Sequence, residues 1–373
     1  MMKQFRIVPT IQQFDNCKEL CQNFQIGKGD LVFVSEGTYE RYFKHHIDRE
    51  AYFVNYRKYG KGEPTDIMVE SIYADIKDYK FNRVFGIGGG TILDVAKLFA
   101  LKTTVPVVDL FNKKLEIVKD KELILIPTTC GTGSEVTNIS ILELTSIRSK
   151  FGLAVDELYA DYAALVPELL EHLPMEFFAA SSIDALIHGI ESYTSPKAND
   201  FTKLFSKKAM EMILRGYKII AENGKEARKP LLKDFMMASA FAGVAFGNAG
   251  CAAVHAMSYP LGANYHVPHG EANYVMFTEV YKAYQSMKPD GTIRELNIFL
   301  ADILECEPNE IYNEIENLLN HIIMKKALHE YGVKEEELEN FTDEVMTKQT
   351  RLMANNYVPF SREQILAIYK SLY

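Results

Sequence analysis

Asp184 and His188 stand four residues apart, and His255 and His269 follow fourteen residues apart in the next third of the chain. Residues at positions i and i+4 of an α-helix share one face, so this carboxylate and this imidazole can bind the same ion. The two later histidines could complete a set of one aspartate and three histidines. Such donors suit a divalent first-row metal, Fe(II) or alternatively Zn(II). Because the set has no thiolate, a structural cysteine-type zinc site is the weaker interpretation. The alternative is that each histidine is an ordinary core or surface residue.

Three glycines and a threonine follow an apolar run at 83–87 and open a predicted helix. A backbone without Cβ atoms can approach a ligand closely, and the free N–H groups of a helix N-terminus attract a diphosphate. The run differs from the Gly-x-Gly-x-x-Gly dinucleotide fingerprint, so a tight packing turn is the alternative. The four residues are Gly88, Gly89, Gly90 and Thr91.

Two charged residues, Asp94 and Lys97, lie on the first turns of this predicted helix. Asp94 could cap the helix or bind a ribose, and Lys97 could reach a phosphate or form a salt bridge that points outward.

A second segment, directly after the apolar run at 122–126, is rich in glycine and hydroxyl groups. Ligands of open α/β sheets bind at the carboxyl ends of such strands, which makes this segment a second predicted contact of a nucleotide. A turn that caps the next helix through Ser134 and Glu135 is the alternative. The hydroxyl residues of the segment are Thr128, Thr129, Thr132 and Ser134.

The predicted secondary structure that must position these residues changes near residue 175. Short apolar runs alternate with a helical pattern before it, which predicts an α/β layer with a mostly parallel sheet. The later part is compatible with helices throughout, and Pro174 favours a boundary there. We therefore expect an α/β, Rossmann-like nucleotide-binding domain over 1–174 and an all-α metal-binding domain over 175–373. Strands are expected at 30–35, 51–55, 83–87 and 122–126, and helices at 65–77, 176–193, 201–221, 231–246, 251–261 and 310–328.

The composition narrows the class of protein. The chain has 373 residues, which favours two domains, and 47% of them are hydrophobic. A formal net charge of −9 argues against a nucleic-acid binder or a protein of anionic membranes. No segment reads as a signal peptide or a membrane span. Five cysteines without a Cys-x-x-Cys pair fit a reducing compartment. We expect a cytoplasmic protein that forms a homodimer or a higher homo-oligomer.

Five motifs, in order, resemble those of the iron-dependent (group III) alcohol dehydrogenase family. They are Gly88-Gly-Gly-Thr-x-x-Asp94-x-x-Lys97, Pro127-Thr-Thr-x-Gly-Thr-Gly-Ser-Glu135, Asp184-Ala-Leu-Ile-His188-x-x-Glu191, His255-Ala-Met-x-x-Pro-Leu-Gly262 and Pro268-His-Gly270. Within the family, segments 59–64, 264–273 and 355–363 resemble the NAD-dependent branch that interconverts 4-hydroxybutyrate and succinate semialdehyde.

The resemblance implies a metal in the helical domain, usually Fe(II) and sometimes Zn(II), and NAD in the N-terminal domain, with the active site in the cleft between them. It implies that the metal ligands are Asp184, His188, His255 and His269.

The resemblance also implies positions around the cofactor. Thr128 and Thr129 match residues that line its phosphates and ribose, and Asp94 and Lys97 match positions nearby. Glu36 falls where the family often has an acidic residue at the adenine ribose. A carboxylate there accepts hydrogen bonds from a 2′-hydroxyl and repels a 2′-phosphate, which favours NAD over NADP.

The chain departs from the family pattern at three places. Tyr259 stands where a second histidine often serves as a proton shuttle, Cys130 stands where alanine is usual, and Ser182 stands where the family often has glycine. His266, three residues before His269, could lend an imidazole to the site or could simply pack beside the ligand loop. A phenol is a poor base at neutral pH, so we expect His266→Ala to reduce turnover more than Tyr259→Phe.

These features together predict reversible hydride transfer between NAD(H) and a small alcohol or aldehyde, with 4-hydroxybutyrate and succinate semialdehyde as the expected pair. Arg148 and Lys150 are candidates for binding the substrate carboxylate. Polyol oxidation of the glycerol dehydrogenase type is the nearest alternative. A metal-dependent hydrolase would not need the two nucleotide segments, and a nucleotide sensor would not need the four metal ligands.

Overall fold

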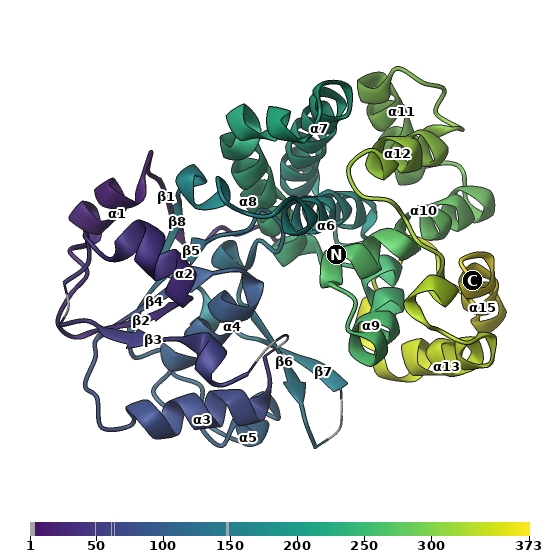
Figure 1. Ribbon diagram of the computed structural model, residues 1–373. Coiled ribbons are helices and arrows are strands. Elements are labelled where there is room, and N and C mark those ends of the chain that lie inside the picture. Colours follow the sequence, from purple (N-terminus) through teal and green to yellow (C-terminus); the bar gives the residue numbers. More distant parts are fainter. Residues whose placement is uncertain (1–3, 49, 61, 63, 147–148) are drawn as a thin grey trace. The chain divides into compact units, whose positions relative to one another are not determined.

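The computed structural model describes residues 4–48, 50–60, 62, 64–146 and 149–373, and the chain divides into two compact units. One unit is Ile7–Leu173 and combines a parallel sheet with helices. The other consists of Pro174–Tyr373 and is built from helices (Figure 1). The predicted fold class is confirmed. The described residues before Ile7, which the sequence placed with the first domain, belong to the helical unit.

The sheet of the α/β unit has six parallel strands in the order β1-β8-β5-β4-β2-β3. The chain runs from β2 outward to β3 and then returns to β4 on the opposite side of β2, so the strand order reverses between β2 and β4. The strands are β1 (Thr10–Gln13), β2 (Asp30–Val34), β3 (Tyr52–Val54), β4 (Arg83–Gly88), β5 (Glu122–Pro127) and β8 (Tyr162–Leu165), and a separate antiparallel pair consists of β6 (Ile139–Leu144) and β7 (Ser149–Ala154).

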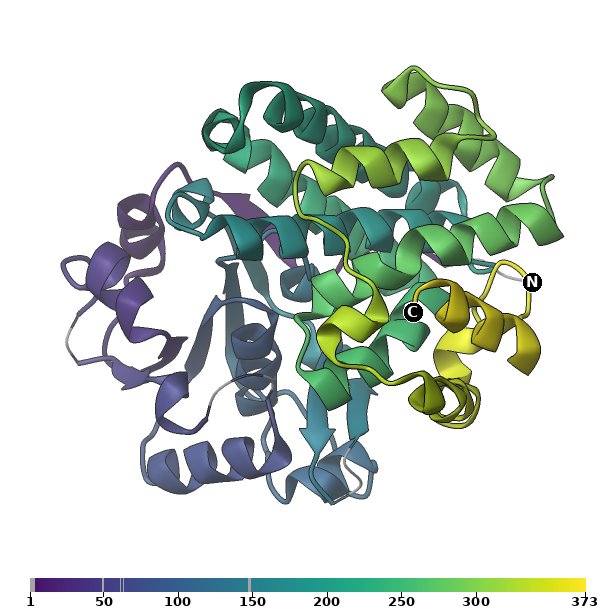
Figure 2. The same ribbon diagram turned by 45° about the vertical axis from the view of Figure 1, so that its right-hand side comes forward.

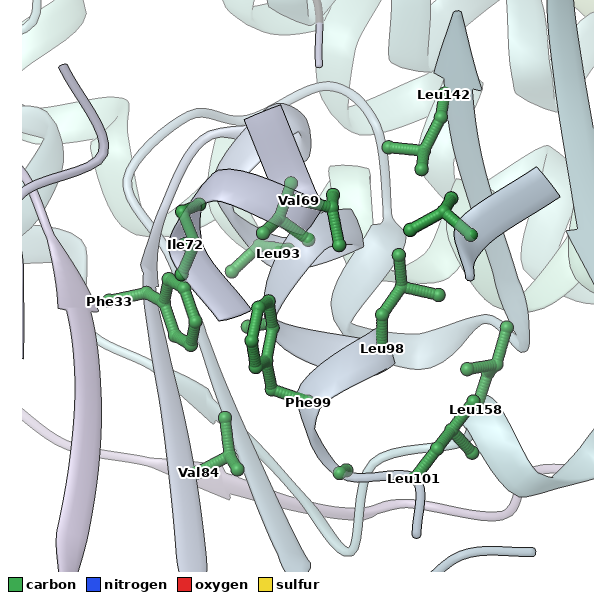
Figure 3. Close-up of a cluster of buried hydrophobic side chains, with 14 of the residues drawn as sticks. Phe33, Val69, Ile72, Val84, Leu93, Leu98, Phe99, Leu101, Leu142 and Leu158 are labelled. Atoms are coloured by element: carbon green, nitrogen blue, oxygen red, sulfur yellow. The ribbon is translucent and has the colours of Figure 1, made fainter. Parts of the chain in front are cut away.

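Successive residues of each central strand face opposite sides of the sheet, and both sides are buried. Leu31 and Phe33 of β2 pack with α3 and α4 on one side, in the cluster of Figure 3. Val32 and Val34 belong to the cluster on the other side, which includes residues of α1. This double burial explains the unbroken apolar runs, and each fully buried side chain of this size contributes about 1.5–3 kcal/mol.

Helices cover both sides of this sheet, and side chains define where several of them begin. Asn16 caps α1 by accepting from the Glu19 amide, and Thr65 caps α3 by accepting from the Met68 amide at 3.1 Å. The helices are α1 (Cys17–Phe24), α2 (Glu36–Thr38), α3 (Asp66–Ile76), α4 (Gly90–Phe99) and α5 (Val107–Phe111).

The helical unit is organised around α6, which packs against α7, α8 and α10 (Figures 1 and 2). All residues from Ser182 to Thr194 are buried, so α6 is enclosed on nearly every side, and its polar side chains must find partners inside the unit. The helices are α6 (Met175–Thr194), α7 (Asp200–Asn223), α8 (Leu232–Ala249), α9 (Ala253–Tyr265), α10 (His269–Met287), α11 (Thr292–Leu304), α12 (Ile311–Asn320), α13 (Leu338–Lys348), α14 (Thr350–Met353) and α15 (Arg362–Ser371).

One predicted helix is too long. The expected helix at 310–328 ends at Asn320, because the Asn320 side chain accepts from the Lys325 amide and turns the chain. Within the described residues, no single helix meets the length and hydropathy expected of a membrane span. The pair Lys225–Ala249 and Ala253–Tyr265, bent by 106°, meets them only when taken together.

Candidate metal and nucleotide sites

Three helices of the helical unit bring the predicted metal ligands together. Asp184 and His188 lie one turn apart on α6, His255 lies on the first turn of α9, and His269 begins α10. The Asp184 Oδ1 atom is 3.6 Å from His255 Nε2 and 3.8 Å from His269 Nε2. Donor atoms of Asp184, His255 and His269 all lie within 4.8 Å of one another, which is the spacing of a group able to hold a metal ion.

His188 approaches this group from the side. Its Nε2 atom is 3.0 Å from His255 Nε2, and its Nδ1 atom is 3.9 Å from Asp184 Oδ2. Its ring stacks on Phe246 of α8 with centroids 4.2 Å apart, which fixes the plane of the imidazole. His188 forms a second compact group with His255 and Cys251.

Glu191 supports His255. It closes the Asp184–Glu191 motif, and the sequence alone did not predict a role for it. It is fully buried on α6, seven residues after Asp184, and therefore on the same stripe of the helix. Its Oε2 atom is 2.6 Å from His255 Nδ1, and its Oε1 atom accepts from the Val254 amide at 2.7 Å. A carboxylate that holds Nδ1 leaves Nε2 of His255 free for a metal.

Asn273 and Gly270 place the start of α10 against α6. The buried Asn273 amide donates to Asp184 Oδ1 at 2.7 Å and lies 3.2 Å from His269 Nε2. A Cβ atom on Gly270 would lie 1.9 Å from the Ala180 carbonyl oxygen, so only glycine lets the two backbones come this close. Neither residue could be assigned from spacing alone.

The donor set fits a divalent cation. Burial by itself opposes ionisation of Asp184, but the neighbouring His188 and His269 imidazoles outweigh it and hold the pKa of the carboxyl below its usual range. Two buried Nε2 atoms 3.0 Å apart face each other, and a cation between such nitrogens satisfies both lone pairs. One carboxylate with several imidazoles is the chemistry of Fe(II) and Zn(II) sites.

The nucleotide segments lie in the α/β unit at the strand ends where the strand order reverses. Val34 at the end of β2 pairs with Ile87 of β4, and Gly88 pairs with Pro127 at the end of β5. Ligands of open α/β sheets bind at the carboxyl ends of strands beside such a reversal. Glu36 follows β2 there and is exposed, on α2.

The two loops after β4 and β5 pack against each other. Gly89 is the N-cap of α4 and makes no side-chain cap, so the first N–H groups of the helix remain for a ligand. A Cβ on Gly90 would lie 2.8 Å from Thr132 Cγ2, and one on Gly89 would lie 3.4 Å from Thr129 Cγ2. Gly90 is therefore needed for this close approach, whereas a Cβ on Gly89 would make an ordinary van der Waals contact. Thr91 and Thr128, at the two loop edges, are partly buried.

Lys97 does not point outward. Its side chain is fully buried, and its ammonium donates to Ser134 Oγ at 2.7 Å and to the Ile139 carbonyl at 2.6 Å. Ser134 in turn donates to Asp94 Oδ1, whose second oxygen accepts from the Ile141 amide at 3.0 Å. The predicted outward salt bridge is wrong, because these inward partners take the ammonium. Asp94 likewise does not cap α4, whose N-cap is Gly89. Contact of either residue with the cofactor stays a prediction.

Burial changes the proton affinities of this network. It raises the pKa of Asp94 and lowers that of Lys97, and their mutual attraction offsets part of both effects. Burial also raises the pKa of Glu135 to about 7. The interpretation of Ser134 and Glu135 as side-chain caps is wrong, since the short helix at Ser134–Val136 has Gly133 at its N-cap and no side-chain cap.

Tyr259 lies closer to the metal group than His266 does. The Tyr259 ring is partly buried on α9, 6.1 Å from the His269 ring. His266 ends the same helix with a left-handed backbone (φ 54°) and is exposed. Among the described residues, no hydrogen bond or ion pair joins His266 to a metal-group side chain.

Comparison with known proteins decides the family. A family model for iron-containing alcohol dehydrogenase matches residues 6–167, and one for the C-terminal part of the Fe-containing alcohol dehydrogenase family matches residues 178–373. The chain belongs to the iron-containing alcohol dehydrogenase family. It is an oxidoreductase, as the resemblance in its motifs implied.

Individual proteins are similar to this chain over most or all of its length. It is 50% identical over 372 residues to 4-hydroxybutyrate dehydrogenase of Clostridium kluyveri, covering 100% of both chains. It is 36% identical to long-chain-alcohol dehydrogenase 1 of Geobacillus thermodenitrificans, covering 83% of this chain and 80% of that one. The sulfoacetaldehyde reductase of Bifidobacterium kashiwanohense, solved in complex with NAD+, has the same fold, with a TM-score of 0.85 at 20% identity over 100% and 99% of the two chains.

The positions of Tyr259 and His266 favour the opposite order of effects on turnover for their substitutions, and the roles of both residues stay predictions. We expect Tyr259→Phe to lower kcat about tenfold, because the Tyr259 ring lies 6.1 Å from the His269 ring and its phenol is our candidate for the proton transfer. His266→Ala should stay within about twofold of wild type. The measurement is kcat against pH for both variants. A larger loss in His266→Ala, with a changed profile between about pH 6 and 8, would restore the first expectation.

Two further expectations fall partly outside the described residues. Arg148, a candidate for the substrate carboxylate, and Glu63, in one of the resembling segments, both lie outside them. Lys150, the other candidate, is partly buried on β7.

Proposed function

We propose that this protein interconverts 4-hydroxybutyrate and succinate semialdehyde with NAD(H), using a divalent metal, Fe(II) or alternatively Zn(II), held by Asp184, His188, His255 and His269. The observation that carries the proposal is the convergence of the buried Asp184 and His255 with the partly exposed His269, in a chain 50% identical, over its full length, to a 4-hydroxybutyrate dehydrogenase. The glycine and hydroxyl loops after β4 and β5 support NAD as the second reactant.

When bound, the metal supplies Lewis acidity toward a carbonyl oxygen, and NAD(H) supplies or accepts the hydride. The residues of this chain bind and orient both. Glu191 holds the His255 ring with Nε2 toward the group, and Asn273 holds the Asp184 carboxylate. Phe246 covers His188 and keeps water from that side. The amide groups at the start of α4 are available to a diphosphate. Tyr259 is the side chain that we expect to carry the proton.

The reaction itself can be tested on the full chain. Anaerobic reconstitution with Fe(II), followed by NADH and succinate semialdehyde, should give a loss of NADH absorbance, and NAD with 4-hydroxybutyrate should give the reverse. Glycerol with NAD serves as the comparison. Turnover with glycerol but not with the C4 pair would establish the polyol alternative, and no turnover with any alcohol or aldehyde would refute the proposal.

The preference for NAD should depend on Glu36. We expect Glu36→Gln to reduce the ratio of kcat/KM for NADH over NADPH by about 10–100-fold, because a charge-assisted hydrogen bond to the ribose is lost and repulsion of the 2′-phosphate is removed. Glu40→Gln is the matched control, since Glu40 is also exposed in the next turn of the chain and pairs with Lys44. Equal use of both cofactors by the unchanged protein would count against this role.

The proposal includes a homodimer or a higher homo-oligomer, as expected from the sequence. Sedimentation velocity of the metal-loaded protein over a range of concentrations would establish its mass in solution.

A further inference from the structure

Cys251 lies close to the imidazoles of His188 and His255, two of the predicted metal ligands. We propose that Cys251, His188 and His255 form a second position for a soft divalent ion such as Zn2+ or Cd2+. This position shares His188 and His255 with the proposed set of Asp184, His188, His255 and His269. This inference rests on the proposed function only for the presence of a metal centre.

The three side chains are buried and close together. Exposed fractions are 8% for Cys251 and 4% for each histidine, and their donor atoms lie within 4.8 Å of one another. Two imidazole nitrogens bound to one tetrahedral zinc ion are about 3.4 Å apart. The Nε2 atoms of His188 and His255 are 3.0 Å apart, so the two rings are close to that arrangement without large movement.

The backbone holds the thiol in place between α8 and α9. Gly250 turns the chain with a positive φ of 79°. The Asn355 amide donates to the carbonyls of Ala249 at 2.9 Å and Cys251 at 3.2 Å, and Ser195 Oγ donates to the Ala249 carbonyl at 2.6 Å. A buried cysteine is often a small apolar side chain. Here two imidazoles converge on it, which is the environment of a ligand.

Charge and donor type explain what this position would select. A thiolate with two imidazoles is a softer set than a carboxylate with imidazoles and favours Zn2+ or Cd2+ over Fe2+. His255 has only one nitrogen available, because Nδ1 is held by Glu191. One ion at a time can therefore use His255, and a soft ion bound with Cys251 excludes Fe2+ from the first group.

Cobalt reports the ligand set directly. The full chain is stripped with a chelator and reloaded with Co2+, and the near-ultraviolet thiolate-to-cobalt charge-transfer band is recorded beside the visible d–d bands. We expect the band in the wild-type protein, its loss in Cys251→Ser and its retention in Cys306→Ser, the control at a partly exposed cysteine. It should also persist in His269→Ala, because His269 is not in the second group. Cd2+ affinity should fall at least about tenfold in Cys251→Ser.

The outcomes separate this inference from the proposed function. Visible d–d bands without a charge-transfer band in the wild type, or a charge-transfer band that survives in Cys251→Ser, would refute the role of Cys251 and leave the metal centre standing. The absence of every cobalt band from the wild type would refute both.

Discussion

Replacing His269 with alanine is expected to lower kcat by at least about 1,000-fold, because losing one donor removes Lewis acid assistance worth several kcal/mol. Bound metal, measured after gel filtration, should fall in parallel. The fold should survive, since 30% of the His269 side chain is exposed and Asp184 keeps its hydrogen bond from Asn273. NADH binding, measured by fluorescence, should also survive, because its predicted contacts lie in the α/β unit.

The control for this variant is His321→Ala. His321 belongs to the same unit and is exposed, and its side chain contacts the Asn317 carbonyl through Nδ1 at 2.8 Å. It should keep full metal content and turnover. Full metal content with near-normal activity in His269→Ala would show that His269 is not a ligand.

Gly270→Ala is expected to have the second large effect. The new Cβ would lie 1.9 Å from the Ala180 oxygen and 2.7 Å from its carbonyl carbon, and both are backbone atoms that cannot rotate away. The start of α10 must move off α6, carrying His269 away from Asp184. We expect a loss of at least about 1–3 kcal/mol in the free energy of unfolding, the usual cost of overpacking, together with weaker metal binding.

Gly262→Ala provides the matched comparison in the neighbouring helix α9. Its Cβ would meet the Val267 carbonyl at an ordinary 3.6 Å, so alanine should be neutral or stabilise the helix by up to about 1 kcal/mol. Denaturant unfolding and metal titration of both variants measure the difference. Equal stability of the two would mean that the approach of α10 to α6 tolerates a side chain.

The sequence predicted the features that depend on local periodicity, which are helix faces and buried strands. The spacing of Asp184 and His188 placed them on one helix face, and the apolar runs located β2, β4 and β5 nearly to the residue. It did not predict β1, because Thr-Ile-Gln-Gln is a short and mostly polar strand at the sheet edge. Periodicity carries no information on an edge strand that is largely exposed.

Contacts between segments that are distant in the sequence could not be predicted from residue spacing. Lys97 is an example: lysine is rarely buried, so an inward ammonium depends on acceptors from residues 134–139, which only the folded loop supplies. Glu191 could have been found, because it continues the stripe of Asp184 and His188 on α6. The contact of Cys251 with two histidines required residues 251–255 to meet His188 of α6, and the spacing of the chain does not reveal that contact.

Phe5 and Arg6, just before the α/β unit, pack on the helical unit, and this affects both the synthesis of the chain and the design of fragments. Phe5 stacks on Phe201 at 5.3 Å and on Phe205, and Arg6 exchanges two hydrogen bonds with the Asn248 side chain. The α/β unit is therefore an insertion in the chain of the helical unit. During synthesis, Phe5 must wait on the order of ten seconds for its partners. A fragment that starts at residue 175 would lack this segment, and Phe201 and Phe205 would lose their contact with the Phe5 ring.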